Sequence, residues 1–458
     1  MSLSNVIKYL DKNEAKHLEL LFDIIRQKSI SATGEGVEEC ADKIVKMMNG
    51  LGIRAKKFKT EGLPVVYGEI TSNPDALTVL IYGHYDVQPP DPLDQWLSDP
   101  FEPTIRDGKI YARGSGDDKG QFMAHILAAA ALKKDGWPDI NVKFLLDGEE
   151  ESSSVSLPKF ISDNREMLKA DVAISSDGPK HPSGRPVVFF GVRGLLYVQI
   201  TLEGAKHDLH SGNNGNVAPT PAWDIVRLLN EIFPNNGQCQ IPHFYDDVLD
   251  ATEYEKDLIK NMPFEKEGYL ETMNLNDTDM DNEEFWHKLM FEPTVNICGL
   301  GSGYQGKGSK TIIPNQAMVK MDFRLVPEQD PNKIFDNLVK YIKNQYPNAK
   351  IEKFGVTVPT RTSAELNISK AVVEAVRLGS KQEPVVQPRL GGSTPDYLIT
   401  KHLKLPSIWV PFANADENNH SPNENINVDD FYDGIKISAT IIHKLAQQSK
   451  EKLLEDLV

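Results

Sequence analysis

The stretch Leu77-Thr78-Val79-Leu80-Ile81-Tyr82-Gly83-His84-Tyr85-Asp86-Val87 indicates the fold class of this chain. Its first half is apolar and β-branched, which predicts a buried strand at residues 77–82. His84 and Asp86 follow at once. In an open α/β sheet, polar residues at the carboxyl end of a buried strand occupy a standard position for a functional site. The alternative is a loop with one surface histidine and one surface aspartate. The choice between the two depends on whether the rest of the chain supplies the other residues that such a site needs.

Strands and helices alternate around this stretch. Apolar periodicity predicts strands at residues 53–59, 64–70, 142–146, 172–175 and 405–411, and helices at residues 13–28, 37–51, 121–134, 367–379 and 428–447. This alternation predicts an α/β fold with a mixed, mostly parallel sheet flanked by helices. Residues 88–113 are rich in Pro and Asp, which predicts a long loop.

The pattern changes near residue 187. Strands are expected at residues 187–190, 195–202, 316–326 and 350–357, with helices at residues 221–233 and 332–346. Residues 235–290 are acidic and polar, and we interpret them as an insertion of short helices and loops. We therefore predict a smaller α+β domain, residues 188–357, inserted into a larger domain that consists of residues 1–187 and 358–458.

Composition excludes several classes of protein. The chain has 458 residues, with 50 Lys and Arg against 66 Asp and Glu and a net charge of −16, which argues against a nucleic-acid-binding protein. No run of apolar residues is as long as a membrane span, which needs about 18 residues, and no signal peptide is visible. The cysteines Cys40, Cys239 and Cys298 are far apart and give no disulfide framework. We expect a cytoplasmic protein that binds neither nucleic acid nor membranes.

Acidic residues and histidines recur after apolar segments or at junctions between a loop and a helix. They are His84, Asp86, Asp117, Asp118, Glu149, Glu150, Glu151, Asp177 and His420. Because the carboxyl ends of parallel strands meet at one edge of a sheet, these side chains should lie close together. So many like charges would repel one another unless cations bind between them. Histidine and carboxylate ligands without cysteine suit Zn²⁺, and also Mn²⁺ or Co²⁺, and two ions that share a bridging carboxylate fit this number of ligands.

Several motifs resemble the carnosinase-type dinuclear metallodipeptidases, which are related to aminoacylases and succinyl-diaminopimelate desuccinylases. The motifs occur in the family's order and span essentially the whole chain. They are Gly83-His84-Tyr85-Asp86-Val87-Gln88-Pro89, Gly114-Ser115-Gly116-Asp117-Asp118-Lys119-Gly120, Glu149-Glu150-Glu151-Ser152, Asp208-Leu209-His210-Ser211-Gly212, Arg324-Leu325-Val326-Pro327 and Asn419-His420-Ser421-Pro422-Asn423-Glu424. The resemblance implies a zinc-exopeptidase-like catalytic domain and an inserted lid or dimerisation domain.

The resemblance also implies the roles of the metal ligands. His84 and Asp177 would bind one ion, His420 and Glu151 the other, and Asp117 would bridge both. Asp86 would hydrogen-bond to His84 and fix its tautomer. Glu149 and Asp118 would not be ligands.

By the same resemblance, Glu150 would be the general base of an amide hydrolysis in which two divalent cations activate a shared water. His210 would stabilise the oxyanion of the partner subunit's active site in a homodimer formed through the inserted domain. Arg324, Gly392 and Ser393 would bind the substrate's C-terminal carboxylate. Without the resemblance, His210 and Arg324 would be interpreted as a loop cap and a solvated surface charge.

These inferences predict a metal-dependent hydrolase of dipeptides or short peptides. Two alternatives stay open: an N-acyl amino acid amidohydrolase, such as a desuccinylase or deacylase, and a catalytically silent binding homologue. Members of the dipeptidase branch often carry a further substrate-contacting histidine where the chain returns to the catalytic domain. Residues 356–362 contain no histidine here, and Arg361 is the candidate replacement.

Overall fold

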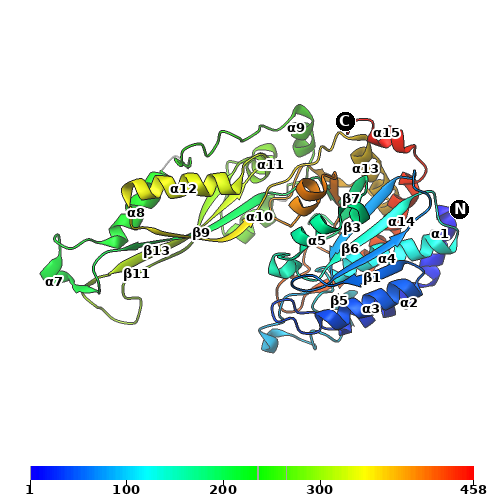
Figure 1. Cartoon of the computed structure of the whole chain (residues 1–458), viewed down its shortest axis with the longest axis horizontal. Helices are drawn as coiled ribbons and strands as arrows, with labels where there is room; N and C mark the ends of the chain where they lie inside the picture. The colour runs from blue at the N-terminus through cyan, green and yellow to red at the C-terminus, as the bar shows by residue number, and fades with distance from the viewer. Residues whose placement is uncertain (1, 235–236, 265, 458) are drawn as a thin grey trace.

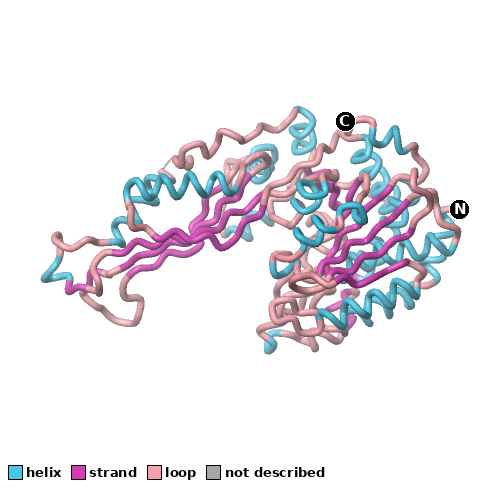
Figure 2. The backbone as a smooth tube through the Cα atoms, in the orientation of Figure 1, coloured by secondary structure: helices cyan, strands magenta, loops and turns pink. Residues whose placement is uncertain are grey.

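The computed structural model describes residues 2–234, 237–264 and 266–457. The chain forms a rounded part, which contains both chain ends, and an elongated part that extends away from it (Figure 1). Figure 2 shows a separate sheet in each part.

The rounded part is built on an eight-stranded sheet with the order β1-β2-β6-β3-β7-β16-β8-β15. The strands are β1 (Arg54–Phe58), β2 (Val65–Ile70), β3 (Thr78–His84), β6 (Asn141–Asp147), β7 (Val172–Ser175), β8 (Val187–Phe189), β15 (Val385–Gln387) and β16 (Ser407–Trp409). β3 pairs in parallel with β6 and β7, as do β16 with β7 and β15 with β8. The pairs β1–β2, β2–β6 and β16–β8 are antiparallel. The predicted fold class, a mixed and mostly parallel sheet, is confirmed.

Helices cover both faces of this sheet, which explains why its strands are apolar on both sides. Val79 and Ile81 of β3 contribute to the core on one face, whereas Leu80 and Tyr82 contribute to the core on the other. The first face packs against α1 (Leu3–Lys12), α2 (Glu14–Arg26), α3 (Val37–Gly50), α4 (Lys119–Lys134), α13 (Asn367–Ser380), α14 (Val428–Leu445) and α15 (Lys450–Leu454). The second packs against α5 (Leu157–Asp163), α6 (Arg165–Leu168) and a π-helical segment, Leu398–Leu403.

The elongated part contains a four-stranded antiparallel sheet with the order β11-β13-β9-β14. Its strands are β9 (Gly194–Glu203), β11 (Thr294–Ser302), β13 (Gln316–Leu325) and β14 (Lys350–Thr357). Alternate residues of β13, among them Val319 and Phe323, pack beneath α8 (Pro221–Ile232) and α12 (Pro331–Gln345). The far end carries α7 (Ser211–Asn214) and the short strands β10 (Leu209–His210) and β12 (Ile312–Ile313).

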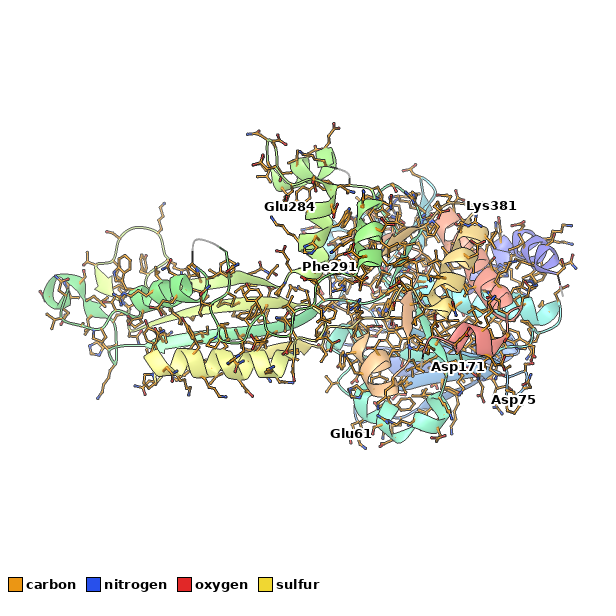
Figure 3. The ribbon with its side chains drawn as sticks, turned by 90° about the horizontal axis from the view of Figure 1, so that it is seen from above. Glu61, Asp75, Asp171, Glu284, Phe291 and Lys381 are labelled. Atoms are coloured by element: carbon orange, nitrogen blue, oxygen red, sulfur yellow. The ribbon has the colours of Figure 1, made fainter. Side chains whose placement is uncertain are left out.

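The chain between α8 and β11 returns from the elongated part to the large sheet. It contains α9 (Glu253–Lys260), α10 (Lys266–Met273) and α11 (Asn282–Phe291). Ile259, Met290 and Phe291 belong to the core on the second face of the large sheet, together with Trp409. Figure 3 shows Phe291 at the junction of the two parts. Short helices were predicted here; residues 235–236 and 265 lie outside the described residues.

The structure differs from the sequence prediction in several places. The helix α1 and the strand β11 were not predicted; no residue of β11 is buried, so its sequence lacks apolar alternation. The predicted loop 88–113 contains β4 (Thr104–Arg106) and β5 (Lys109–Tyr111), which pair with each other, and β5 also pairs with β17 (Asn425–Asn427). The strand β8 spans the predicted boundary at residue 188 but pairs in the large sheet. The division at residues 188 and 357 stays a prediction. Among the described residues, no helix has the length and apolarity to span a bilayer.

Lys119 shows how a charged residue of a motif serves the fold. Its side chain is fully buried at the start of α4, and Nζ donates to the backbone oxygens of Ile24, at 3.2 Å, and Gln27, at 2.7 Å. These carbonyls lie at the C-terminal end of α2, where helical carbonyls lack partners within the helix. Lys119 therefore joins α2 to the loop that carries Asp117.

Replacing Lys119 with Met should destabilise the protein, because it leaves two carbonyls at the end of α2 without their charged donor. We expect the free energy of unfolding to fall by about 1.5–3 kcal/mol, measured by urea denaturation. Lys16→Met, an exposed change on α2, is the control and should alter it by less than about 0.5 kcal/mol. Equal stabilities of the two variants would contradict this role of Lys119.

Candidate active site

The carboxyl ends of neighbouring strands place most of the predicted site residues. His84 is the last residue of β3, and Asp177 lies two residues beyond the end of β7. Glu150 and Glu151 occupy a 3₁₀ turn that follows β6. Asp117 lies just before α4, and His420 lies in the loop between β16 and β17. Five segments that are distant in sequence therefore converge at this edge of the sheet.

Two groups of ligand-type atoms share Asp117. Nε2 of His84 lies 3.0 Å from Oδ1 of Asp117 and 3.8 Å from Oδ2 of Asp177. Nε2 of His420 lies 3.1 Å from Oδ2 of Asp117 and 3.1 Å from Oε2 of Glu151. Each triad, His84–Asp117–Asp177 and Asp117–Glu151–His420, has its ligand atoms within 4.8 Å of one another. The two oxygens of Asp117 thus face different histidines, as a bridging ligand requires.

The donors fit a pair of divalent cations. Nε2 of His84 is buried and makes no hydrogen bond with any described residue, although a carboxylate oxygen lies 3.0 Å away. Ligands at about 2.0–2.2 Å from a tetrahedral ion are separated by about 3–4 Å, which matches the distances within both triads. Residues of both triads, with Asp117 shared, could therefore hold two ions.

The charges around the triads favour the same interpretation. Burial, and then the negative charge of Asp117, raise the pKa of the Asp177 carboxyl to about 7. Burial also raises the pKa of Glu150 well above its usual range. Burial by itself lowers the pKa of His84, but the neighbouring Asp117 and Asp86 carboxylates raise it well above its ordinary value. Cations bound among these groups would relieve the repulsion between the carboxylates.

Asp86 holds two parts of the site together. It is fully buried, and its two carboxylate oxygens accept hydrogen bonds from the backbone N–H groups of Glu150 and Glu151, each at 3.1 Å. Nδ1 of His84 lies 3.1 Å from the backbone oxygen of Asp86 and 3.4 Å from its carboxylate. The residue that was expected to orient His84 therefore also fixes the turn that carries Glu150.

The three consecutive glutamates have different surroundings. Glu149 points away from the triads, and its carboxylate accepts hydrogen bonds from the backbone N–H groups of Leu63, at 3.0 Å, and Ser156, at 2.9 Å. Glu151 accepts a hydrogen bond from Gln88 at 2.9 Å and faces His420. Asp118, interpreted as a non-ligand, accepts a hydrogen bond from the backbone N–H of His84 at 3.1 Å. Glu149 and Asp118 thus serve the framework around the triads.

Arg324, Gly392 and Ser393 lie together where the two parts of the molecule meet. Nη1 of Arg324 donates to Oγ of Ser393 at 3.1 Å, and Ser393 donates to the backbone oxygen of Arg193 at 2.7 Å. The backbone N–H of Arg193 donates to the oxygen of Gly392 at 3.1 Å. The guanidinium of Arg193 is a further cation here that the sequence analysis did not identify. Burial, and then the charge of Arg324, lower its pKa to about 10.

Arg361 is engaged in a different contact. Nη2 of Arg361 lies 3.0 Å from Oε2 of Glu255 on α9, and the other oxygen of Glu255 lies 3.2 Å from Arg389. The Arg389 guanidinium also lies 4.1 Å from the centre of the Phe291 ring. Glu255 on α9 therefore joins Arg361 to Arg389, at the start of the loop that leads to Gly392.

His210 lies apart from both triads within this chain. It precedes α7 at the far end of the elongated part (Figure 1), is exposed, and its Nδ1 accepts a hydrogen bond from the backbone N–H of Gly212 at 3.0 Å. With Nδ1 as acceptor, the neutral ring carries its proton on Nε2, which is then a donor. The geometry within one subunit does not bring this donor to the metal ligands.

Sequence reasoning assigned no role to three residues that surround the triads. They are Arg113, Glu417 and Glu424. Glu424, which was quoted only as part of a motif, accepts hydrogen bonds from the N–H groups of Gly116, at 3.0 Å, and Asp117, at 3.1 Å, and pairs with the buried Arg113 at 2.6 Å. Glu417 is buried beside Gly116, and neither of its carboxylate oxygens has a hydrogen-bond partner among the described residues. Single acidic residues in loops carry no sequence signal that separates them from solvated charges.

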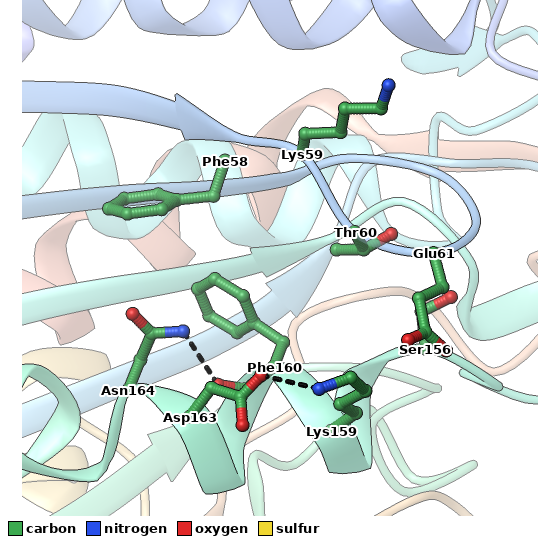
Figure 4. Close-up of a pocket in the computed structure, with 9 residues that line it drawn as sticks. All are labelled: Phe58, Lys59, Thr60, Glu61, Ser156, Lys159, Phe160, Asp163 and Asn164. Carbon is green, nitrogen blue, oxygen red and sulfur yellow. Dashed lines mark hydrogen bonds and ion pairs between the residues drawn. The ribbon is translucent and has the colours of Figure 1, made fainter.

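A surface hollow lies away from these residues. Its volume is about 370 Å³, and its lining includes Phe58, Glu61, Lys159 and Phe160, with Lys159 paired to Asp163 (Figure 4). None of the triad residues lines it. Because its charged groups are paired with each other or exposed, it offers no comparable constellation of ligands.

Metal content can test the assignment of the two triads. We expect His84→Ala and His420→Ala each to retain one tightly bound ion, whereas Asp117→Ala should lose both, because Asp117 belongs to both triads. The measurement is metal stoichiometry by mass spectrometry after dialysis against the ion. His207→Ala, an exposed change in the elongated part, should keep the wild-type content. Two bound ions in the Asp117→Ala variant would contradict the shared ligand.

Comparison with known proteins agrees with these motifs. The model of the peptidase family M20/M25/M40 matches residues 80–444. The Cys-Gly metallodipeptidase dug1 of Schizosaccharomyces pombe is 29% identical over 98% of this chain and 99% of its own length. The Beta-Ala-His dipeptidase of Mus musculus is 27% identical over 97% of this chain and 96% of its own length. In a solved structure, the M20 family metallo-carboxypeptidase Sso-CP2 from Sulfolobus solfataricus is 38% identical, with a TM-score of 0.87, over 94% of this chain and 99% of its own. The chain belongs to peptidase family M20/M25/M40.

Proposed function

We propose that this protein is a dinuclear metallopeptidase that hydrolyses the amide bond of dipeptides or short peptides with a free C-terminal carboxylate. The observation that carries the proposal is the pair of histidine–carboxylate triads that share Asp117. Its relatives include proteins named as a Cys-Gly metallodipeptidase, a Beta-Ala-His dipeptidase and a metallo-carboxypeptidase, all of which act on peptides. These names favour peptides over N-acyl amino acids as substrates.

The proposed ligands are His84, Asp117 and Asp177 for one ion and Asp117, Glu151 and His420 for the other. Bound divalent cations would lower the pKa of a water molecule and polarise the scissile carbonyl. Nitrogen and carboxylate donors favour Zn²⁺, and Mn²⁺ or Co²⁺ can use the same donors.

Glu150 is the proposed general base. Its carboxyl lies on the 3₁₀ turn whose backbone is fixed by Asp86, and it is close enough to His84 and Asp177 for their charges to change its pKa. It would take a proton from the attacking water and then donate this proton to the nitrogen of the leaving amine. Because Asp86 holds the turn rigidly, Glu150 needs little reorganisation between the two steps.

Arg324, Gly392 and Ser393 would bind the substrate's C-terminal carboxylate. A guanidinium matches the planar geometry of a carboxylate, and the hydrogen bond between Arg324 and Ser393 keeps both donors on one side. Requiring a free carboxylate would restrict cleavage to the C-terminal end of a peptide.

His210 would act in the active site of a partner subunit. Its Nε2 can donate a hydrogen bond to a developing oxyanion, but it lies at the far end of the elongated part. The elongated part also exposes apolar side chains that a homodimer could cover, among them Trp223 on α8, 62% exposed, and Ile297 on the edge strand β11, 55% exposed. The expected cytoplasmic location stays a prediction.

A hydrolysis screen tests the function. Dipeptides, tripeptides and N-acyl amino acids are incubated with the enzyme and either Zn²⁺ or Mn²⁺, and release of free amine is measured. We expect cleavage of dipeptides with a free carboxylate and little cleavage of the same dipeptides with an amidated C-terminus. Glu150→Gln should bind both ions but lose about 10²- to 10⁴-fold in kcat, because it cannot accept the proton. Cleavage of N-acyl amino acids alone, or unchanged turnover by Glu150→Gln, would contradict the proposal.

Mixed dimers test the role of His210. Homodimers of His210→Ala and of Glu150→Gln should both be nearly inactive. After the two variants are denatured and refolded together, half of the dimers contain one subunit of each kind. In such a dimer, one of the two sites combines an intact Glu150 with an intact His210 from the other subunit. Activity should return to about a quarter of the wild-type value if His210 acts across the dimer. Activity that stays at the level of the separate variants would show that His210 does not act in the partner's site.

A further inference from the structure

Gln121, in the first turn of α4, connects three loops of the site. It is fully buried. Its Nε2 donates to the backbone oxygens of Gly116, at 2.7 Å, and Gly178, at 3.2 Å, and its Oε1 accepts from the backbone N–H of Phe412 at 2.7 Å. The side-chain amide thus uses both of its hydrogens and its oxygen.

Two of these loops carry metal ligands next to the contact. Gly116 directly precedes Asp117, and Gly178 directly follows Asp177. These two aspartates are the carboxylates of the His84 triad. Phe412 lies in the loop between β16 and β17, which carries His420 eight residues further on. Gln121 therefore lies beside both carboxylates of the His84 triad, whereas in the His420 triad it lies beside the shared Asp117 alone.

A neighbouring residue on α4 supports the same framework. Nε2 of His125 lies 2.7 Å from Oγ of Ser176, which donates to the backbone oxygen of Val410 at 2.6 Å. Gln121 and His125 are four residues apart and so lie on one side of the helix. This side of α4 holds the segments 176–178 and 410–412 beside the Asp117 loop.

We propose that Gln121 is a positioning residue that sets the spacing of Asp117 and Asp177 and thereby the affinity of the His84 triad for its metal ion. Its hydrogen bonds go to backbone groups of the three loops and not to the side chains of the ligands. Only a carboxamide supplies two donors and one acceptor at this position, since glutamate has no N–H and methionine has neither group. The inference rests on the proposed metal centre. Residues that orient metal ligands typically change metal affinity by about 10- to 100-fold when replaced.

The test measures Zn²⁺ affinity directly, in variants designed to keep one triad. Apoprotein carrying His420→Ala retains the His84 triad, and apoprotein carrying His84→Ala retains the other. Each is titrated with Zn²⁺ in competition with a chromophoric chelator, with and without Gln121→Glu or Gln121→Met. We expect Gln121 substitutions to weaken binding about 10- to 100-fold in the His420→Ala background and clearly less in the His84→Ala background.

A second buried amide is the matched control. Asn141 lies at the opposite end of the large sheet, where Nδ2 donates to the backbone oxygen of Asn73 and Oδ1 accepts from the N–H of Ser72, both at 2.8 Å. Asn141→Leu should lower stability, measured by urea denaturation without metal, and leave both Zn²⁺ affinities unchanged. Equal losses of affinity in Asn141→Leu and in the Gln121 variants would assign the effect to general destabilisation and overturn the proposal.

The remaining outcomes separate this inference from the proposed function. Wild-type protein that binds no Zn²⁺ would overturn the metal centre and this inference with it. Wild-type protein that binds two ions, together with Gln121 variants of unchanged affinity in both backgrounds, would overturn the role of Gln121 alone. If Gln121→Met does not fold, the isosteric Gln121→Glu variant carries the comparison.

Discussion

Asp117 places one carboxylate oxygen beside His84 and the other beside His420, within a buried group of further carboxylates. Burial in the protein disfavours each negative charge, and each charge also disfavours the next. The consequence is visible in the pKa of Asp177, raised to about 7, and in that of Glu417, raised to about 9 by burial and then by Asp117. Such a group is stable in its charged form only with cations among the carboxylates, and the rest of the site is arranged around this requirement.

The framework that holds these charges apart consists largely of carboxylates bonded to backbone N–H groups. Asp86 fixes the turn of Glu150 and Glu151, Glu149 fixes the segments at Leu63 and Ser156, and Glu424 fixes the loop of Asp117. Charged acceptors form stronger hydrogen bonds than neutral ones, so they hold irregular turns in place without regular secondary structure. The many acidic residues of the site thus divide into those that face the triads and those that orient them.

The elongated part is connected to the site by contacts that do not involve the metal ligands. Glu255 pairs with Arg361 and Arg389, and Phe291 packs against Arg389, so the returning segment fixes the loop that carries Gly392 and Ser393. The arginine considered as a substitute for the missing histidine therefore has a structural partner. On the far side, His210 lies well away from its own subunit's triads, which is why its proposed role requires a second copy of the chain.

From the sequence alone we could predict the α/β class, the strand ends that carry His84, Glu150 and Asp177, and the family, because apolar periodicity and short motifs are local properties of the chain. The sequence did not predict β11, which has no buried residue and so lacks apolar alternation, or the packing of α9 and α11 against the large sheet. Three features became visible only in the folded chain: which oxygen of Asp117 faces which histidine, which backbone groups Glu149 holds, and that Gln121 joins three loops. These are contacts between residues far apart in sequence, and a single sequence carries no local signal for them.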